Sequence, residues 1–533
     1  MLEEMTNNAN STDENARVIY ENTLDGLRQV MAIKAKAVLP YLVPQLISPT
    51  VNTRALASLA PVSGEALHRH LPKILPALIS ALAQSTINPQ ELEFAEAVVL
   101  SVSDDESDLG ISIVMEELMS ASNFKRDEGN RPKVDEASLG KQRAAITLLA
   151  SFCKDTKCDF SQYVPQLIRT LILLFTSQDP VVLNQSWNAL NSVTKTLDTS
   201  DQMAHVGDVR QAVRFAVADL RYSNLADTSL MPGFCLPKGI TPILPIFRES
   251  ILNGPPELKE TAAIGLGEVI KLTSSEALKP SVVHITGPLI RILGDRFGAN
   301  VKTAVLDTLA GLLNKAGVLL KPFFPQLQTT FVKALNDPNR TVRLKAGVAL
   351  SYLIDIHMRP DPLFNELANG IKNSDETTVR DTYLQALRGC LEPSGAKMSA
   401  PIKRQVLPLL ISLISHPEDS SRSAAAGCLG AFCKWLPDED LSSVIDEVLL
   451  NSSGSEWQVK HGRSAALYVA LKDAPERIVK DHRDKIVNVV KTYVTSDVVA
   501  LAQNGVRATG YLFLHLMREN EDLASDLISP FCR

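Results

Sequence analysis

An apolar motif containing proline recurs along the chain at nearly constant spacing, and this repetition constrains the fold more than any other feature. The motif reads YVPQLIRTL at Pro165, ITPILPIF at Pro245 and PFFPQLQTTF at Pro325, so that 80 residues separate each successive pair. QVLPLLISL at Pro408 follows 83 residues later, and ITGPLIRIL at Pro288 divides the second interval into 43 and 37 residues. The unit is therefore about 40 residues long, the size of a repeat built from a pair of helices.

A second helix is predicted after each motif, beyond a polar break. Apolar residues recur there with helical spacing, as at Val342, Ala346, Ala349 and Leu350. Helices of this kind are predicted over 142–153, 257–272, 301–315, 341–354, 378–391, 421–433 and 505–514. Because no stretch alternates apolar and polar residues with a period of two, no sheet is predicted. The sequence therefore predicts an all-α solenoid, a superhelix of antiparallel helix pairs.

The composition agrees with a chain of stacked helices. Hydrophobic residues make up 45% of the sequence and aromatic residues only 5%, so that small aliphatic side chains would form the core. The 533 residues exceed what one ordinary core holds. A net charge of −6 excludes general affinity for nucleic acid as the default interpretation.

The segment NDPNRTVR indicates which type of helical repeat the chain contains. Asp337 precedes Arg343 by six residues. This arrangement resembles HEAT repeats, in which an aspartate of the turn pairs with an arginine six residues later and forms a ladder between repeats. Shorter spacings of the same kind occur at Asp375/Arg380 and Asp419/Arg422.

The helical repeat pattern is interrupted at a few places, and these interruptions define the predicted domain boundaries. Residues 199–238 lack the repeat pattern and are predicted to be an irregular, ordered connector. The predicted parts are a disordered polar tail (1–18), HEAT repeats (19–122), a polar loop or linker (123–140), HEAT repeats (141–395), and further HEAT repeats (396–533) that continue beyond the end of this sequence.

No constellation of catalytic or cofactor-binding residues is recognisable. The sequence has no phosphate-binding loop, no H-E-x-x-H and no G-x-S-x-G. Gly265 and Gly267 form a broken dinucleotide-binding motif inside an alanine-rich helix, which favours helix packing. Seven cysteines without a framework pattern indicate reduced thiols, and the polar N-terminus has no secretory signal. We therefore expect a cytoplasmic protein that is not an enzyme and holds no cofactor or metal.

Two arginines in GPLIRILGDRF are candidates for partner binding. Leu289, Ile292 and Leu293 would form the apolar face of this helix, which turns Arg291 outward. An outward guanidinium on a rigid helix can anchor a carboxylate of a partner. Arg296 is the second basic candidate. The alternative for both is a solvated surface arginine.

Longer motifs resemble one particular family of HEAT proteins. SVVHITGPLIRILGDRF, LKPFFPQLQTTFVKALNDPNRTVRLKAGVALSYLI, DPLFNELANGI and VKHGRSAAL are similar to the C-terminal part of the general-control-nonderepressible translational activators. The resemblance extends over residues 25–517. Generic HEAT proteins have no physical need to share these gapless stretches.

This resemblance implies a function that the residue pattern alone does not give. Members of the family are very large HEAT solenoids that associate with ribosomes. They activate the kinase of translation initiation factor 2 alpha during amino-acid starvation or ribosome stalling. The family's kinase-binding arginine lies in the motif ITGPLIR, here residues 285–291, so the resemblance assigns contact with the kinase's RWD domain to Arg291. The implied partners are this RWD domain and the ribosome, with no membrane and no sequence-specific nucleic acid.

Two other functions remain open at this point. A generic HEAT-repeat adaptor or transport receptor would have similar repeats. An enzyme with an unrecognised site would need a nucleophile–base pair or a phosphate-binding loop, neither of which is evident.

Overall fold

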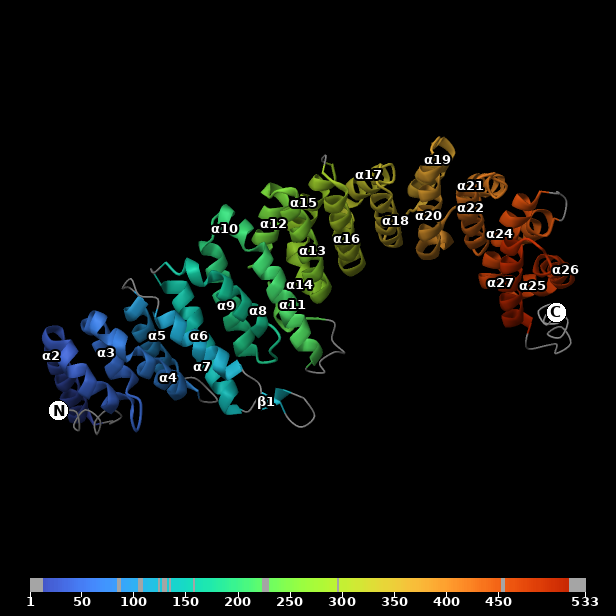
Figure 1. The fold of residues 1–533 in the computed structure, drawn as a ribbon. Coiled ribbons are helices and arrows are strands. Elements are labelled where there is room, and N and C mark those ends of the chain that lie inside the picture. The colour runs from blue at the N-terminus through green and yellow to red at the C-terminus, as the bar shows by residue number, and fades with distance from the viewer. Residues whose placement is uncertain are drawn as a thin grey trace. The chain divides into compact units, whose positions relative to one another are not determined.

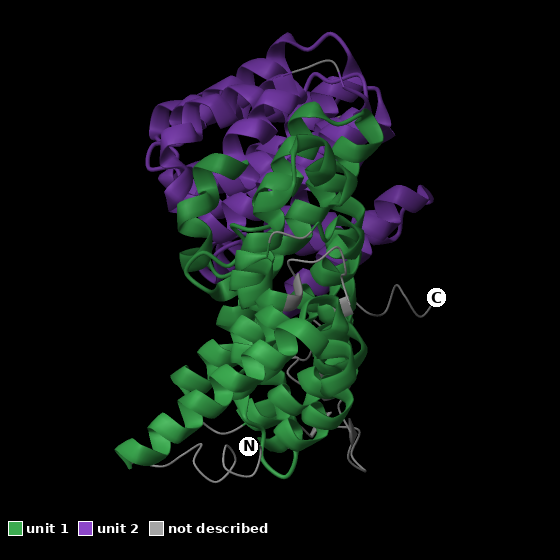
Figure 2. Ribbon diagram, turned by 90° about the vertical axis from the view of Figure 1, so that its left-hand side faces the viewer, with its two compact units in different colours: residues 1–285 green, residues 286–533 purple. Residues whose placement is uncertain are grey.

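The computed structural model describes residues 13–83, 88–103, 109–122, 125–126, 132–133, 136–156, 159–222, 230–294, 297–451 and 456–516. These residues are almost entirely helical (Figure 1). The chain divides into two compact units, residues 1–285 and 286–533, coloured separately in Figure 2.

The first unit is a succession of helices joined by short turns. Its longer helices are α2 (Glu14–Ile47), α3 (Thr53–Ser63), α4 (Leu71–Leu82), α5 (Pro89–Ser103), α6 (Leu109–Ser122), α7 (Glu136–Asp155), α8 (Val164–Leu174), α9 (Pro180–Thr196), α11 (Val206–Tyr222), α12 (Leu244–Asn253) and α13 (Pro256–Leu272). Its short elements are η1 (Gly64–His70), β1 (Lys125–Arg126), β2 (Pro132–Lys133), η2 (Ser161–Tyr163), α10 (Thr199–Ala204), η3 (Pro232–Cys235), α14 (Ser275–Leu278) and η4 (Lys279–Ser281). The boundary between the units falls within α15 (Val282–Gly294).

The second unit has the more regular helix pairs. Its longer helices are α16 (Ala299–Ala316), α17 (Phe324–Ala334), α18 (Arg340–Asp355), α19 (Asp361–Asn373), α20 (Thr377–Ser394), α21 (Ala400–Leu413), α22 (Asp419–Cys433), α24 (Trp457–Asp473), α26 (Arg483–Val494) and α27 (Val499–Leu516). Its short elements are η5 (Gly317–Phe323), η6 (Gly395–Lys397), α23 (Asp438–Ser443), η7 (Val444–Leu449) and α25 (Glu476–Asp481).

Stacking of each pair's second helix on the next defines the second unit. α16 packs on α18, α18 on α20, α20 on α22, α22 on α24, and α24 on α27. The first helices α17, α19 and α21 cover α18, α20 and α22 (Figure 1). This arrangement confirms the predicted all-α HEAT solenoid.

The sequence explains where the helices begin. Pro165, Pro245 and Pro325 lie in the first turns of α8, α12 and α17, where their missing N–H groups cost no intrahelical bond. Asp179 and Asn339 cap α9 and α18, each accepting two backbone N–H groups with its side chain. The prolines Pro288 and Pro408 lie further inside α15 and α21 than the motif suggested.

Several predicted boundaries differ from the structure. The segment 199–238 was expected to be irregular, yet it contains α10 and α11. Val206, Val209, Val213 and Ala216 give α11 a continuous buried stripe, and this pattern is a helical signal. α7 begins at Glu136, inside the predicted loop, and α2 begins at Glu14, inside the predicted tail. The tail residues before Asp13 lie outside the described part.

A short two-stranded β-sheet was also not expected. β1 and β2 form an antiparallel pair in which Lys125 opposes Lys133 and Arg126 opposes Pro132. Each strand has only two residues, too few to show the period of two by which strands are recognised in a sequence.

Two stretches, Glu14–Ile47 and Ala299–Ala334, are long and apolar enough to cross a membrane by length and composition alone. Core helices of proteins without a membrane meet the same criterion. In the second stretch, α16 and α17 both pack against α18, which covers their apolar faces.

Candidate partner-binding surface

Arg291 lies on the exposed side of α15. Leu289, Ile292 and Leu293 are buried with exposed fractions of 0%, 2% and 9%, whereas Arg291 is exposed. The prediction that the apolar face turns this arginine outward is therefore confirmed. Helix geometry fixes the direction of the Cα–Cβ bond, so the guanidinium is presented from a rigid base.

Two glycines flank Arg291 on the exposed face. Gly287 lies one turn before it and Gly294 nearly one turn after it, and a Cβ atom built at either glycine meets nothing within 4 Å. Residues at these spacings are the nearest neighbours on a helix surface. A partner can therefore approach the guanidinium without displacing a side chain of α15 at either position. We call Gly287, Arg291 and Gly294 the Arg291 face.

No hydrogen bond or ion pair of the Arg291 guanidinium is found among the described residues. A guanidinium exposed in this way can bind a carboxylate in the bidentate geometry that arginine favours. The second candidate, Arg296, lies outside the described residues, so its position relative to Arg291 stays a prediction.

The predicted HEAT ladder exists in the second unit, but its atoms pair differently. The Lys302 ammonium lies 2.7 Å from the Asp337 carboxylate, which joins α16 to the turn before α18. Arg343 instead donates from Nη1 to the carbonyl oxygens of Asp337 and Pro338, at 2.9 and 3.1 Å. The expected pairing of the Asp337 carboxylate with Arg343 is therefore wrong, because Lys302 occupies that carboxylate.

The same arginine geometry recurs in two later repeats. Arg422 donates to the carbonyls of His416 and Pro417 and forms an ion pair of 2.6 Å with Asp419, which confirms that pairing. Arg380 donates to the carbonyl of Ser374. No contact between Asp375 and Arg380 is found among the described residues. These arginines therefore hold the turns inside the solenoid and are not available to a partner.

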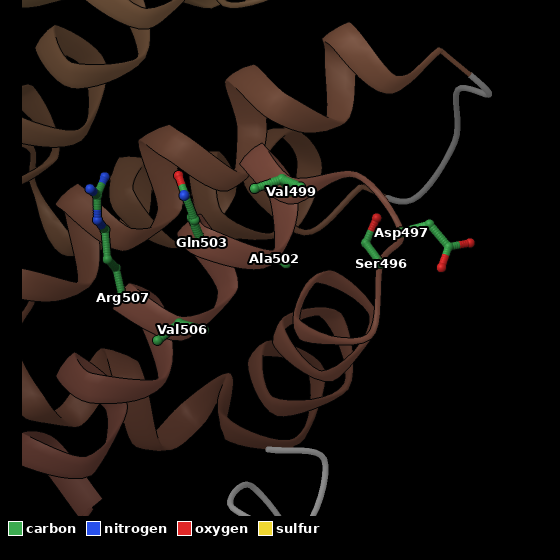
Figure 3. Close-up of a pocket in the computed structure, with 7 residues that line it drawn as sticks. All are labelled: Ser496, Asp497, Val499, Ala502, Gln503, Val506 and Arg507. Atoms are coloured by element: carbon green, nitrogen blue, oxygen red, sulfur yellow. The ribbon is translucent and has the colours of Figure 1, made fainter. Parts of the chain in front are cut away.

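A shallow hollow lies at the start of α27 (Figure 3). It has a volume of about 500 Å³ and is lined by Ser496, Asp497, Val499, Ala502, Gln503, Val506 and Arg507. In Figure 3 the side chains of Gln503 and Arg507 project from the same side of α27. The lining mixes one acidic, one basic and several small apolar side chains, and it contains no nucleophile–base pair.

The described residues contain no group of three or more His, Cys, Asp or Glu placed to hold a metal ion. Cys153, Cys235, Cys390, Cys428 and Cys433 are free thiols. Burial raises the pKa of Cys428 and of Cys433 to about 12, so both stay protonated at neutral pH. Cys158 and Cys532 lie outside the described residues.

The broken glycine motif packs as predicted. A Cβ atom at Gly265 would lie 2.8 Å from a ring carbon of Phe247. This close approach of α12 to α13 explains the glycine without a nucleotide.

Sequence reasoning missed two features of the surface. The flanking glycines Gly287 and Gly294 are present in the sequence motif. That they leave space beside Arg291 could be recognised only once the exposed side of α15 was known. The ion pair between Lys302 and Asp337 joins two repeats, and its spacing of 35 residues was the available signal.

Family models match three parts of the chain. Models described as stalled ribosome sensor GCN1-like HEAT repeats match residues 38–238 and 361–533. A model of HEAT-like repeats matches residues 299–353.

Solved structures of other solenoids align with lower similarity. A crystal structure of importin beta is 14% identical, with a TM-score of 0.40, over 100% of this chain and 70% of that chain. The karyopherin Kap121p bound to the extreme C-terminus of the protein phosphatase Cdc14p is 15% identical, with a TM-score of 0.44, over 97% of this chain and 52% of that chain.

Much more similar sequences occur among characterised proteins. Stalled ribosome sensor GCN1 of Mus musculus is 48% identical over 500 residues, and the eIF-2-alpha kinase activator GCN1 of Saccharomyces cerevisiae is 32% identical over 501. The alignments cover 93% and 92% of this chain but only 18% of each relative. The repeats, the ladder and these similarities together show that the chain belongs to the GCN1 family of HEAT-repeat proteins and corresponds to a part of its longer members.

Proposed function

We propose that this chain is a non-catalytic scaffold in translational control. It binds the RWD domain of the kinase of translation initiation factor 2 alpha and promotes its activation on ribosomes during amino-acid starvation or ribosome stalling. In this proposal the protein acts in the cytoplasm. The name of the yeast relative, a kinase activator, and that of the mouse relative, a stalled ribosome sensor, support this role.

The observation that carries the proposal is the exposed guanidinium of Arg291 in the motif ITGPLIR, which has no ion-pair partner among the described residues. It stands between two glycines on a rigid helix, so a carboxylate of the RWD domain can reach it from the solvent. Bidentate binding by an arginine at the centre of an interface is a common hot spot. The Arg291 face is the contact we propose for the kinase.

The mechanism is tethering. A solenoid that holds the RWD domain raises the local concentration of the kinase to the order of millimolar near a bound ribosome. Activation then needs no catalytic group from the scaffold. The remaining parts of a longer family member would contribute further ribosome contacts.

A generic adaptor or transport receptor is the alternative, and one experiment separates the two. Immobilised chain is incubated with the isolated RWD domain and, in parallel, with purified ribosomes. The proposal predicts capture of the RWD domain. Failure of the correctly folded chain to bind the RWD domain would favour the generic adaptor.

A further inference from the structure

Three arginines and one exposed phenylalanine lie on neighbouring helices of the first unit, before Arg291 in the sequence. Arg169 comes from α8, Arg210, Arg214 and Phe215 from α11, and Glu268 from α13. α11 packs against both α8 and α13, which brings the three helices together (Figure 1). We call these five residues the arginine–phenylalanine cluster.

Glu268 fixes two of the guanidinium groups. Arg214 donates to Oε1 of Glu268 from Nε and Nη2, at 3.2 and 2.8 Å. Arg210 donates from Nε to Oε2 at 3.2 Å and from Nη2 to Oε1 at 3.4 Å. Burial raises the pKa of Glu268, but the hydrogen bonds from Arg214 and Arg210 outweigh burial and the pKa falls below its usual value. The carboxylate is therefore charged and holds both arginines in place at neutral pH.

Phe215 fixes the third guanidinium. The Arg169 guanidinium carbon lies 4.6 Å from the centre of the Phe215 ring, a cation–π contact. No hydrogen-bond partner of Arg169 is found within the described ranges. Its N–H groups therefore remain available while the ring restricts its position.

The cluster remains open to solvent and carries excess positive charge. The side chain of Arg214 is 60% exposed and Phe215 is 45% exposed. Three guanidinium groups and one carboxylate give these five residues a formal charge of +2, on a chain whose net charge is −6. An exposed aromatic ring beside solvent-accessible arginines is the composition of interface hot spots.

We propose that the arginine–phenylalanine cluster binds a short acidic segment of a partner protein, in which carboxylates flank an apolar side chain. The carboxylates bind Arg169 and Arg214, and the apolar side chain packs on Phe215. Charge favours this occupant over RNA. Nucleic-acid sites neutralise many phosphates with an extended basic surface, whereas this cluster offers two excess charges on an acidic chain.

The test is a titration with a fluorescent synthetic peptide of alternating glutamate and leucine. The proteins are the full chain, Phe215→Ala, and the double variant Arg169→Ala/Arg214→Ala. Arg28→Ala is the matched control, because Arg28 is an exposed helical arginine of the same unit outside the cluster. We expect binding to wild type and to Arg28→Ala, and a loss of affinity of about tenfold or more in the other two variants.

Two further probes distinguish the alternatives. A peptide with glutamine in place of glutamate should bind at least about tenfold more weakly, because it lacks the charge. No binding of the acidic peptide by wild type, or equal binding by wild type and the double variant, would overturn the proposal. Tighter binding of single-stranded polyuridine than of the acidic peptide, lost in the double variant, would overturn it in favour of RNA. Thermal melts confirm that each variant is folded, as expected for exposed positions.

Discussion

The ammonium group of Lys302 lies 2.7 Å from the carboxylate of Asp337, and this ion pair joins the second helix of one repeat to the turn of the next. The two side chains are only 22% and 11% exposed, so water screens the pair less than it screens a surface pair. Asp337 also accepts the backbone N–H of Asn339 in its own turn. One carboxylate thus stabilises both the turn and the stacking of α16 on α18.

Lys302→Ala should lower the free energy of unfolding of the second unit by about 1 kcal/mol, as expected for a partly buried ion pair. Asp337→Ala should cost more, because the turn also loses its acceptor for Asn339. Urea unfolding followed by circular dichroism measures both effects. A double variant that costs no less than the sum of the two single variants would show that the pair contributes no coupling energy.

Arg343→Ala should destabilise the fold by about 2–4 kcal/mol, because two turn carbonyls and the Thr382 hydroxyl lose a donor in a buried place. Arg343→Lys should recover only part of this loss in stability, since an ammonium group cannot reproduce the planar arrangement of the guanidinium N–H donors. The same variants should bind the RWD domain with nearly unchanged affinity whenever they are folded. A stable Arg343→Ala protein that fails to bind would contradict the structural role of Arg343.

The stability of the second unit should depend on pH through His461. Burial first, and then the nearby charge of Arg422, lower the pKa of His461, against a smaller opposite effect of Asp419. The Nε group of Arg422 donates to Nδ1 of His461, which requires that this nitrogen be unprotonated. In the unfolded chain the imidazole binds a proton more readily, so acidification favours unfolding.

The contribution of His461 to the unfolding free energy should therefore be fully present above about pH 7 and should be lost as the pH falls below the ordinary histidine pKa of about 6.5. In His461→Asn this part of the pH dependence should disappear. Urea titrations at several pH values provide the measurement. An equally steep decrease in both proteins would assign the dependence to other groups.

Two glycine substitutions should have opposite effects. A Cβ atom at Gly462 would overlap the carbonyl oxygen of Ile414, so Gly462→Ala must displace backbone and should cost about 3 kcal/mol. A Cβ atom at Gly510 meets nothing within 4 Å, so Gly510→Ala should stabilise α27 by about 0.5–1 kcal/mol. Thermal melts of both variants test this contrast, and a destabilised Gly510→Ala would contradict it.

Repetition in the sequence was enough to predict the second helices. The predicted stretch 301–315 lies inside α16, and 341–354 lies inside α18, because a strict apolar stripe has to be buried by the next repeat. The helix α11 escaped prediction since its segment lacks the proline motif on which the period was based.

The HEAT ladder shows why the partners in an ion pair are harder to predict from sequence than the positions of helices. Spacing correctly placed Asp337 and Arg343 at one turn, but it could not decide which cation reaches the carboxylate. Lys302 competes from the preceding repeat, 35 residues earlier, and this competition depends on the stacking distance of α16 and α18. Likewise, the exposure of Arg291 followed from its apolar neighbours, whereas no spacing in the sequence indicated that Arg169 would stack on Phe215.

The most direct test of the account is a calorimetric titration of the RWD domain into wild type, Arg291→Ala and Arg291→Lys, with Arg28→Ala as the exposed-arginine control. We expect Arg291→Ala to lose about 1–3 kcal/mol of binding free energy while its melting temperature stays unchanged, because its side chain is exposed and forms no ion pair with a described residue. Arg291→Lys should also lose affinity, since lysine cannot bind a carboxylate in the bidentate mode. Wild-type affinity in a folded Arg291→Ala protein would contradict the account.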